Sequence, residues 1–185
     1  WFAGLAGALG CYDVSSGKKY DYSNPRGKPS TWEAIAVTGE RGNETLRVAN
    51  GAGEVFSATM DGSSCPQWDE VVTPGRGSSI TALDFGDRHA YAVDESGVVF
   101  EERSNDWAEI GVENAQVDFF DVNAQDGTVH VAGDEGYIYR YDRACENWTV
   151  MKVGESAFRG IEHRPTNSEA ETTDGTNGRV VAGAN

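Results

Sequence analysis

The stretch AVDESGVVF, at residues 92–100, decides the fold, because two other segments share its pattern. Residues 48–56 read VANGAGEVF, and residues 131–139 read VAGDEGYIY. Each copy indicates a short strand, a turn that closes on glycine, and a second strand that ends in an aromatic residue. The phrase begins again in residues 2–10 and in the last six residues, VVAGAN. Its closing glycines recur every 39 to 46 positions, which is typical of one four-stranded unit per repeat, at Gly7, Gly53, Gly97 and Gly136.

Two further strands complete each repeat. A strand with alternating polar and apolar residues follows the phrase and begins with tryptophan, at Trp68, Trp107 and Trp148. An apolar strand precedes the phrase, at residues 32–37, 80–85, 117–122 and 158–163. The connecting segments are rich in Gly, Asn, Asp, Ser and Pro, which favour turns, and no segment carries a clean helical stripe. The chain is therefore predicted to be all-β, with four antiparallel strands per repeat.

Small antiparallel sheets bury both faces only when they pack against neighbours around an axis. The sequence therefore predicts a β-propeller, with its 185 residues forming a single domain or a segment of one. The apolar strand is expected to be the innermost strand of each blade. The expected blades are residues 1–24 (partial), 31–72, 79–113, 116–154 and 157–185 (partial).

Two arrangements of the incomplete blades stay open. Either the strand at 157–163 closes a four-bladed ring onto residues 1–24, or the natural chain continues and this sequence is a fragment. The fragment is favoured, because WFAG at residues 1–4 and VVAG at residues 180–183 would compete for one place in the ring. The polar stretch Arg164–Arg179 is predicted to be a mobile surface loop.

The charge balance argues against a polyanionic partner. Acidic residues outnumber basic ones by 30 to 15, giving a formal net charge of −15. Nucleic acid would be repelled, whereas cations would be attracted to the surface. Only four basic residues are lysines, and this balance points to a salt-adapted organism, in which salt screens self-repulsion. The longest apolar run, residues 1–12, is too short to span a bilayer, so no membrane insertion is predicted.

The succession of an apolar strand, a Val-Ala-x-x-x-Gly turn, an Ile-Tyr strand and a tryptophan strand resembles the bacterial neuraminidase-type repeat. It is more closely similar to propellers of photosystem II stability/assembly factors, here in a haloarchaeal setting. The resemblance covers nearly the whole chain and implies a scaffold or assembly platform more readily than an enzyme. The family's Asp-box turn, Ser-x-Asp-x-Gly-x-Thr-Trp, is present only in reduced form, as in Arg103–Trp107 and Ala144–Trp148. This departure weakens a sialidase-like interpretation.

Two aspartates are candidate binding residues. Asp84 and Asp121 lie between apolar neighbours on the expected inner strands of successive blades. When the strands 80–85 and 117–122 are aligned, the two aspartates take the same position. Glu162 holds the matching place in the fifth blade, and Ala36 holds it in the second. A partial ring of carboxylates near the axis would hold a cation or face channel water.

A second candidate binding site combines aromatic and basic residues. Tyr20 and Tyr22 stand where other blades have a tryptophan, and Lys18 and Lys19 precede them in the segment KKYDYSNP. This is the only patch in the sequence where aromatic and basic residues adjoin in this way. We expect any local binding spot for a partner to lie here.

Signals for chemistry are weaker. The three histidines share no position in the repeat, and no catalytic residue, metal site or cofactor is predicted. Three cysteines cannot all pair with one another, and none has zinc-ligand spacing. Asn43 and Asn147 begin Asn-x-Thr triplets and are candidate glycosylation sites. An extracellular or cell-surface location is therefore expected, with the cytoplasm as the alternative.

These features predict a non-enzymatic propeller that acts as a scaffold for protein–protein or assembly contacts. The alternative is a propeller that binds or processes glycans, as sialidases do. A third interpretation is a purely structural segment of a longer protein. An enzyme should place two acids and an arginine around one cavity, whereas a scaffold should expose an apolar or aromatic patch.

Overall fold

The computed structural model describes residues 1–23, 31–61, 66–69, 71–74, 77–104, 106–112, 115, 117–125, 127–165 and 178–183. Most of the segment Arg164–Arg179, for which a mobile loop is predicted, lies outside the described residues, as does Cys65.

Five antiparallel sheets follow one another along the chain. The first sheet holds β1 (Phe2–Ala3), β2 (Leu9–Asp13) and β3 (Lys18–Asp21). The second holds β4 (Trp32–Thr38), β5 (Thr45–Asn50), β6 (Val55–Thr59) and β7 (Gln67–Trp68). The third holds β8 (Ile80–Phe85), β9 (Ala90–Asp94), β10 (Val99–Arg103) and β11 (Asp106–Glu109). The fourth holds β12 (Phe119–Gln125), β13 (Thr128–Gly133), β14 (Tyr137–Asp142) and β15 (Asn147–Lys152), and the fifth holds β16 (Gly160–Pro165) and β17 (Gly178–Gly183).

The repeated four-stranded antiparallel sheet predicted from the sequence is therefore confirmed. Two strands are displaced from their expected ranges by two residues, since β12 begins at Phe119 rather than at Val117 and β16 begins at Gly160 rather than at Phe158. The backbone at Val117 lies instead against Gly97, in the turn of the preceding sheet.

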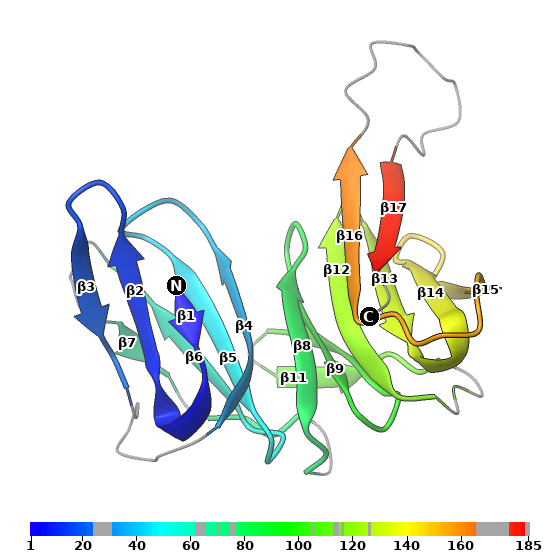
Figure 1. Cartoon of the computed structure of the whole chain (residues 1–185), viewed down its shortest axis with the longest axis horizontal. Coiled ribbons are helices and arrows are strands. Elements are labelled where there is room, and N and C mark those ends of the chain that lie inside the picture. Colours follow the sequence, from blue (N-terminus) through cyan, green and yellow to red (C-terminus); the bar gives the residue numbers. More distant parts are fainter. Residues whose placement is uncertain are drawn as a thin grey trace.

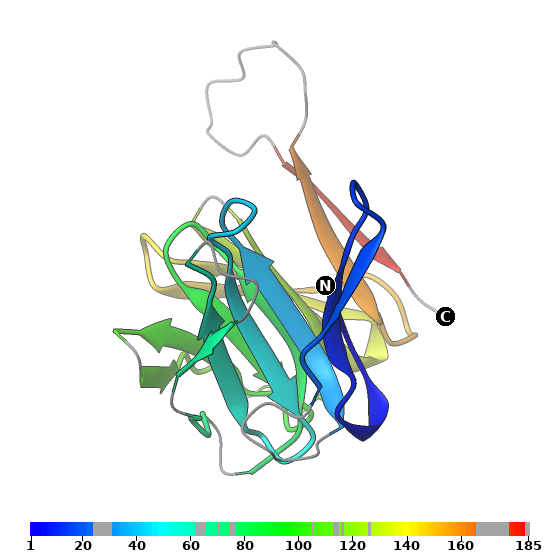
Figure 2. The ribbon, with the colours of Figure 1, turned by 90° about the vertical axis from the view of Figure 1, so that its left-hand side faces the viewer.

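The sheets succeed one another along an arc (Figure 1). The first strands of neighbouring sheets lie against one another: β4 against β8, β8 against β12, and β12 against β16. The strand β1 lies against β4 and pairs with β2, while β16 pairs with β17. Figures 1 and 2 show that β16 and β17 extend beyond the neighbouring sheet at one end.

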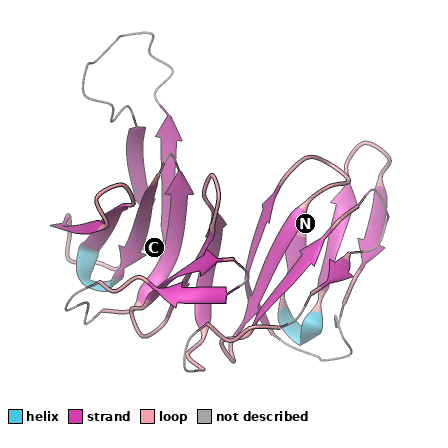
Figure 3. Ribbon diagram, turned by 180° about the vertical axis from the view of Figure 1, so that it is seen from behind, coloured by secondary structure: helices cyan, strands magenta, loops and turns pink. Residues whose placement is uncertain are grey.

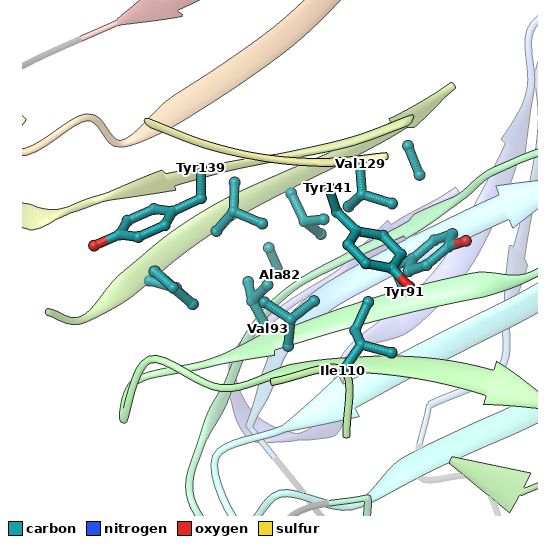
Figure 4. Close-up of a cluster of buried hydrophobic side chains, with 12 residues drawn as sticks. Ala82, Tyr91, Val93, Ile110, Val129, Tyr139 and Tyr141 are labelled. Atoms are coloured by element: carbon teal, nitrogen blue, oxygen red, sulfur yellow. The ribbon is translucent and has the colours of Figure 1, made fainter. Parts of the chain in front are cut away.

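The hydrophobic core lies between the sheets rather than within any one of them. Its largest cluster joins the third and fourth sheets, and Figure 4 shows Val93 and Ile110 of the third sheet packed with Val129 and Tyr139 of the fourth. Similar clusters join the second sheet to the third, the first to the second, and the fourth to the fifth. Each sheet therefore needs its neighbour to bury its apolar face, as the sequence argument required.

Polar contacts also join neighbouring sheets. The Arg47 guanidinium on β5 donates to the Glu102 carboxylate on β10, with Nη2 and Oε1 2.7 Å apart. The Thr81 hydroxyl on β8 donates to the carbonyl oxygen of Phe119 on β12 at 2.8 Å. The interface between the second and third sheets and that between the third and fourth therefore combine apolar packing with directional contacts.

The closing glycine of the repeated phrase has a geometric function. At Gly97 φ is +82°, in the left-handed region that favours glycine. A Cβ atom at Gly97 would overlap the carbonyl oxygen of Val117, which leads into the fourth sheet. At Gly53 a Cβ atom would lie 2.5 Å from the carbonyl oxygen of Ser78, which leads into the third sheet. The repeated glycine therefore lets the backbone that enters the next sheet approach closely.

Two short helical turns lie in the described residues, η1 (Leu5–Gly7) and η3 (Asp134–Gly136), and strands make up most of the rest (Figure 3). Both turns occupy the turn of the repeated phrase. In the described part of the chain, no helix is long and apolar enough to cross a membrane.

Candidate functional site

The two candidate aspartates tie neighbouring sheets together. Asp84, on β8, accepts hydrogen bonds at Oδ2 from the backbone N–H of Ala124 on β12, at 2.8 Å, and from the side-chain amide of Asn123, at 3.3 Å. Asp121, on β12, accepts a hydrogen bond at Oδ2 from the backbone N–H of Ile161 on β16, at 2.8 Å. Both carboxylates lie on first strands, as expected, and both are engaged by the backbone of the next sheet.

The two aspartates do not occupy the same place in their sheets, so that part of the sequence alignment is wrong. In the pairing register, Asn123 takes the place in β12 that Asp84 takes in β8, and Asp121 lies two residues earlier. The reason is the start of the strand, because β12 begins at Phe119, two residues after the expected Val117, whereas β8 begins at Ile80 as expected. Counting back from the closing glycine gives the observed register, since Ile80 precedes Gly97 by as many residues as Phe119 precedes Gly136.

Burial raises the pKa of both carboxyl groups. At Asp84, hydrogen bonds from the N–H groups of Ala124 and Phe85 partly offset the effect of burial, and the nearby Asp121 carboxylate adds to it. At Asp121, hydrogen bonds from Ile161 and Val122 likewise offset part of the effect of burial. Over the described residues, no group of three or more His, Cys, Asp or Glu side chains is placed to hold a metal ion.

Removing the Asp84 carboxylate should weaken the contact between the third and fourth sheets. We expect Asp84→Ala to lower the free energy of unfolding by about 1–2 kcal/mol, because the buried N–H of Ala124 loses its acceptor. Asp84→Asn should cost less, since its amide oxygen can still accept that hydrogen bond. Chemical denaturation measures the difference, with Asp87→Ala in the exposed turn as the control. Equal stability of Asp84→Ala and the control would contradict this structural function.

The aromatic–basic candidate divides between the two faces of the first sheet. The rings of Tyr20 and Tyr22 stack, with centroids 6.4 Å apart and 8° between their planes. Tyr22 stacks in turn on Trp1, at 5.4 Å, and the Lys18 Nζ atom lies 4.9 Å from the centroid of the Tyr20 ring. Tyr22 also packs against the cluster between the first and second sheets. The rings of Trp1, Tyr20 and Tyr22 therefore use their faces to stack on one another.

Lys19 lies on the opposite face of the same sheet. Its Nζ atom is 5.2 Å from the centroid of the Phe2 ring, and its pairing partner is Tyr12. Phe2 is 36% exposed and Tyr12 is 56% exposed. We call the surface formed by Phe2, Tyr12 and Lys19 the outer face of the first sheet. It presents aromatic rings and a positive charge to solvent in a protein of net charge −15.

A cavity of about 600 Å³ lies between the third and fourth sheets, and sequence analysis did not place a site there. Its lining residues come from strands and turns of both sheets: His89, Glu101, Arg103, Ser104, Gly127, Tyr141, Arg143, Ala144 and Glu146. A smaller cavity of about 230 Å³ adjoins it, shares His89, Gly127 and Arg143, and adds Arg88. The two cavities together bring four basic side chains to one interface.

A buried carboxylate organises the larger cavity. The Glu101 side chain, on β10, is 2% exposed. Its Oε2 atom accepts a hydrogen bond from Nε of Arg103 at 2.5 Å, and its Oε1 atom accepts one from Nε of Arg143 at 2.9 Å. The Tyr91 hydroxyl also donates to Oε1, at 3.1 Å, and Figure 4 shows the Tyr91 ring beside that of Tyr141. One carboxylate therefore orients two guanidinium groups from neighbouring sheets.

Arg143 is held at a second point. Its Nη2 atom lies 2.5 Å from Nε2 of His89, and Nδ1 of His89 lies 2.7 Å from the carbonyl oxygen of Glu102. A guanidinium can only donate, so Nε2 accepts and the ring proton resides on Nδ1. The contact with Arg143 therefore requires a neutral imidazole.

The network keeps Glu101 ionised. Burial alone would raise the pKa of Glu101, but hydrogen bonds from Arg103 and Tyr91 and the charges of Arg103 and Arg143 outweigh it, so the pKa lies below its ordinary value of 4.5. Burial, reinforced by the Glu101 carboxylate, raises the pKa of Tyr91, which stays a donor. A glycosidase acid needs a raised pKa and a free proton, and Glu101 has neither property.

One signal for this site was present in the sequence. Glu101 follows Val99 by two residues, and the two-residue period of a strand places both on the same face of β10. Val99 is fully buried in the core between the third and fourth sheets. An acidic residue on an apolar face indicates a buried partner. The identity of that partner was not readable, because Arg143 lies 42 positions away in the sequence.

The candidate modification sites are accessible. Asn43 lies exposed in the segment between β4 and β5, and Asn147 lies exposed at the start of β15. Their glycosylation stays a prediction. Cys11 and Cys145 are free thiols, half-buried and exposed respectively.

No known protein family matches the sequence, and neither does any curated protein. Solved structures do match the fold. Sqt1 of Saccharomyces cerevisiae superposes with a TM-score of 0.76 at 11% identity, over 98% of this chain and 51% of that one. The WD40 repeats of RRP9 give a TM-score of 0.74 at 16% identity, over 87% of this chain and 51% of that one.

A third match is the β-propeller domain of Myceliophteria thermophila Cps50 (Swd1), with a TM-score of 0.64 at 10% identity over 85% of this chain and 53% of that one. The chain thus spans about half the length of these three solved structures. At these identities the likeness concerns the fold alone. The chain has the fold of a β-propeller built from four-stranded antiparallel sheets, as the sequence predicted.

Proposed function

We propose that this chain is a β-propeller scaffold that binds partner proteins and catalyses no reaction. The observation that carries the proposal is the outer face of the first sheet. Phe2 and Tyr12 are exposed there beside Lys19, and Leu5 and Val14, which are 75% and 84% exposed, lie in the turns before and after β2, at its two ends. Exposed apolar side chains gathered in one region are typical of a protein interaction site.

The charge of this face indicates the kind of partner. Lys19 is one of only four lysines in a chain of net charge −15. A partner with apolar side chains surrounded by acidic ones would complement the outer face and would be repelled elsewhere. We also propose that the protein is located outside the cell or on the cell surface of a salt-adapted organism. The acid-rich composition and the exposed Asn43 and Asn147 support that part.

The glycan interpretation is less well supported by the geometry. The larger cavity does hold two acids, Glu101 and Glu146, together with two arginines. Glu101 accepts three hydrogen bonds and is buried beneath them, so it is not available to protonate a leaving group. The rings of Tyr20 and Tyr22 stack on each other and do not present a free platform to a sugar.

Photo-cross-linking tests the scaffold proposal. With a photo-reactive amino acid in place of Tyr12, we expect a defined protein to become cross-linked in the source cells. Lys19→Glu should reduce that cross-link about tenfold, because it reverses the positive charge of the outer face. Lys152→Glu is the matched control, since Lys152 also lies over an aromatic ring, 5.3 Å from the centroid of Tyr137, but on β15.

Two results would contradict the proposal. The first is an identical set of cross-linked proteins when the photo-reactive residue is placed at the exposed Glu109 on β11. The second is hydrolysis of a sialoside or another glycoside by the purified protein that Glu101→Gln abolishes.

A further inference from the structure

We propose that the cavity between the third and fourth sheets is a binding site for a carboxylate group, held by the Nη atoms of Arg103 and Arg143. The inference begins from how these two guanidinium groups are fixed. Each donates its Nε–H to a different oxygen of Glu101, so the shared carboxylate sets the orientation of both. The Nε–H group of each guanidinium is thereby used, which leaves the Nη groups for other acceptors.

The guanidinium groups of Arg103 and Arg143 are accessible to solvent, and some of their N–H donors have no acceptor among the described residues. The side chains of Arg103 and Arg143 are 52% and 38% exposed. Within the described residues, neither Nη atom of Arg103 donates a hydrogen bond, and Nη1 of Arg143 also donates none. These donors border a cavity of about 600 Å³, which has room for a carboxylate and the chain that carries it. Two oriented guanidinium groups match the planar, two-oxygen geometry of a carboxylate.

The rigidity of the pair distinguishes it from an ordinary surface arginine. Arg143 is fixed a second time by His89, and Glu101 is fixed by the Tyr91 hydroxyl. Because the side chains are already ordered, a ligand does not have to restrict them on binding, which reduces the entropic cost of the contact. By contrast, Arg41 is 72% exposed and pairs with Asp13, which is held by the hydroxyls of two serines in its own turn.

Local charge favours a singly charged ligand. Two arginines and Glu101 leave one positive charge at the base of the cavity, within a chain of net charge −15. The Glu146 carboxylate lines the same cavity, and its charge adds to the hydrogen bond and charge of Glu101, which are the main causes of the raised pKa of Arg103. A second negative charge on the ligand, as on phosphate, would be repelled by Glu146 and by the surrounding acidic surface. A carboxylate is therefore favoured over a phosphate.

The carboxylate belongs to an acidic side chain or to the C-terminus of a partner protein, and this identification rests on the proposed scaffold function. Two probes separate these sources. N-acetylglutamic acid α-amide carries only a side-chain carboxylate, and N-acetylalanine carries only a main-chain carboxylate. Acetamide is the uncharged control, and inorganic phosphate is the dianionic control.

The experiment is a titration of the isotope-labelled protein followed by NMR. We expect the Nε–H signals of Arg103 and Arg143 to shift saturably with one or both carboxylate probes. The signal of Arg41 and all signals in acetamide should stay in place. Arg103→Gln should weaken binding about 10- to 100-fold, the effect of losing charged hydrogen bonds. Glu146→Gln should strengthen it several-fold, because it removes the competing carboxylate, while Arg41→Gln should leave it unchanged.

Three results would overturn the proposal: no saturable shift at Arg103 and Arg143, phosphate binding at least as tightly as the carboxylate probes, or equal affinity in the Glu146→Gln variant. The Glu146 side chain is exposed, so that variant keeps the test decisive even where Arg103→Gln unfolds the protein. The probes require no partner protein. If they fail to bind while the Tyr12 cross-link is found, this site is refuted and the scaffold function stands. If the probes bind and no protein is cross-linked, the carboxylate site is supported, but a partner protein as the source of the carboxylate is not.

Discussion

Replacing Gly97 by alanine is expected to destabilise the protein by about 3 kcal/mol or more, the largest single effect that we predict. Two costs combine at this position. The left-handed backbone, with φ at +82°, disfavours any residue with a Cβ atom by about 1–2 kcal/mol. The new Cβ atom would also overlap the Val117 carbonyl oxygen, and only a shift of the backbone that enters the fourth sheet relieves the overlap. Chemical denaturation measures the loss, and the melting temperature should fall by roughly 2–4 °C per kcal/mol.

Gly42→Ala is the matched control for Gly97→Ala. Gly42 has a similar φ of +85°, but a Cβ atom there meets nothing within 4 Å. The control should therefore show only the backbone cost, about 1 kcal/mol. Equal destabilisation by the two variants would mean that the close approach between the sheets contributes nothing, and that the repeated glycine serves its own turn alone.

Replacing Glu101 by glutamine should cost about 2 kcal/mol at neutral pH, the second largest effect. The buried side chain accepts three hydrogen bonds, and glutamine can accept at only one oxygen. The figure is below that of a fully buried ion pair because Arg103 and Arg143 are partly exposed and can regain water. Denaturation at pH 7 measures the loss, with Glu109→Gln on the exposed side of β11 as a control expected to have little effect.

The same variant should change how stability depends on acid. Because the pKa of Glu101 lies lower in the folded protein than its ordinary value of 4.5, its stabilisation is fully present above that pH. The stabilisation is lost as the pH falls through the folded-state value. The difference in stability between the natural protein and Glu101→Gln should therefore shrink below pH 4.5. A difference that stays constant, or grows, with acidification would show that Glu101 is not ionised in the fold.

The fold was readable from the sequence because its strongest signals are local. The repeated phrase contains a strand, a glycine turn and a strand, and its glycines are required by left-handed backbone and by the close approach of the next sheet. The phrase is a local signal, and the next sheet approaches at the same glycine of successive repeats, Gly53 and Gly97, so both constraints leave a pattern that recurs. The error at Asp84 and Asp121 has a local cause as well, since the strand that holds Asp121 begins at Phe119, two residues later than the apolar pattern indicated.

The site was less readable because it depends on contacts between repeats. Glu101, Glu102 and Arg103 form a charged run at the end of a strand, which in sequence looks like a solvated strand end. Glu101 becomes buried only when the fourth sheet packs on the third and brings Arg143 to it. Lys18, Tyr20 and Tyr22 do lie together as the sequence suggested, whereas Lys19 belongs to the opposite face. Their function as a partner-binding spot stays a prediction.

The polar pairs between sheets also bear on how the chain avoids misassembly. Repeat proteins contain similar units that can dock in the wrong order during folding. Here the contacts differ from one interface to the next: Arg47 meets Glu102 between the second and third sheets, and Glu101 meets Arg143 between the third and fourth. A sheet that docked beside the wrong neighbour would leave one of these charges buried without its partner, which costs several kcal/mol. Sheets that share nearly the same shape are thereby made non-interchangeable.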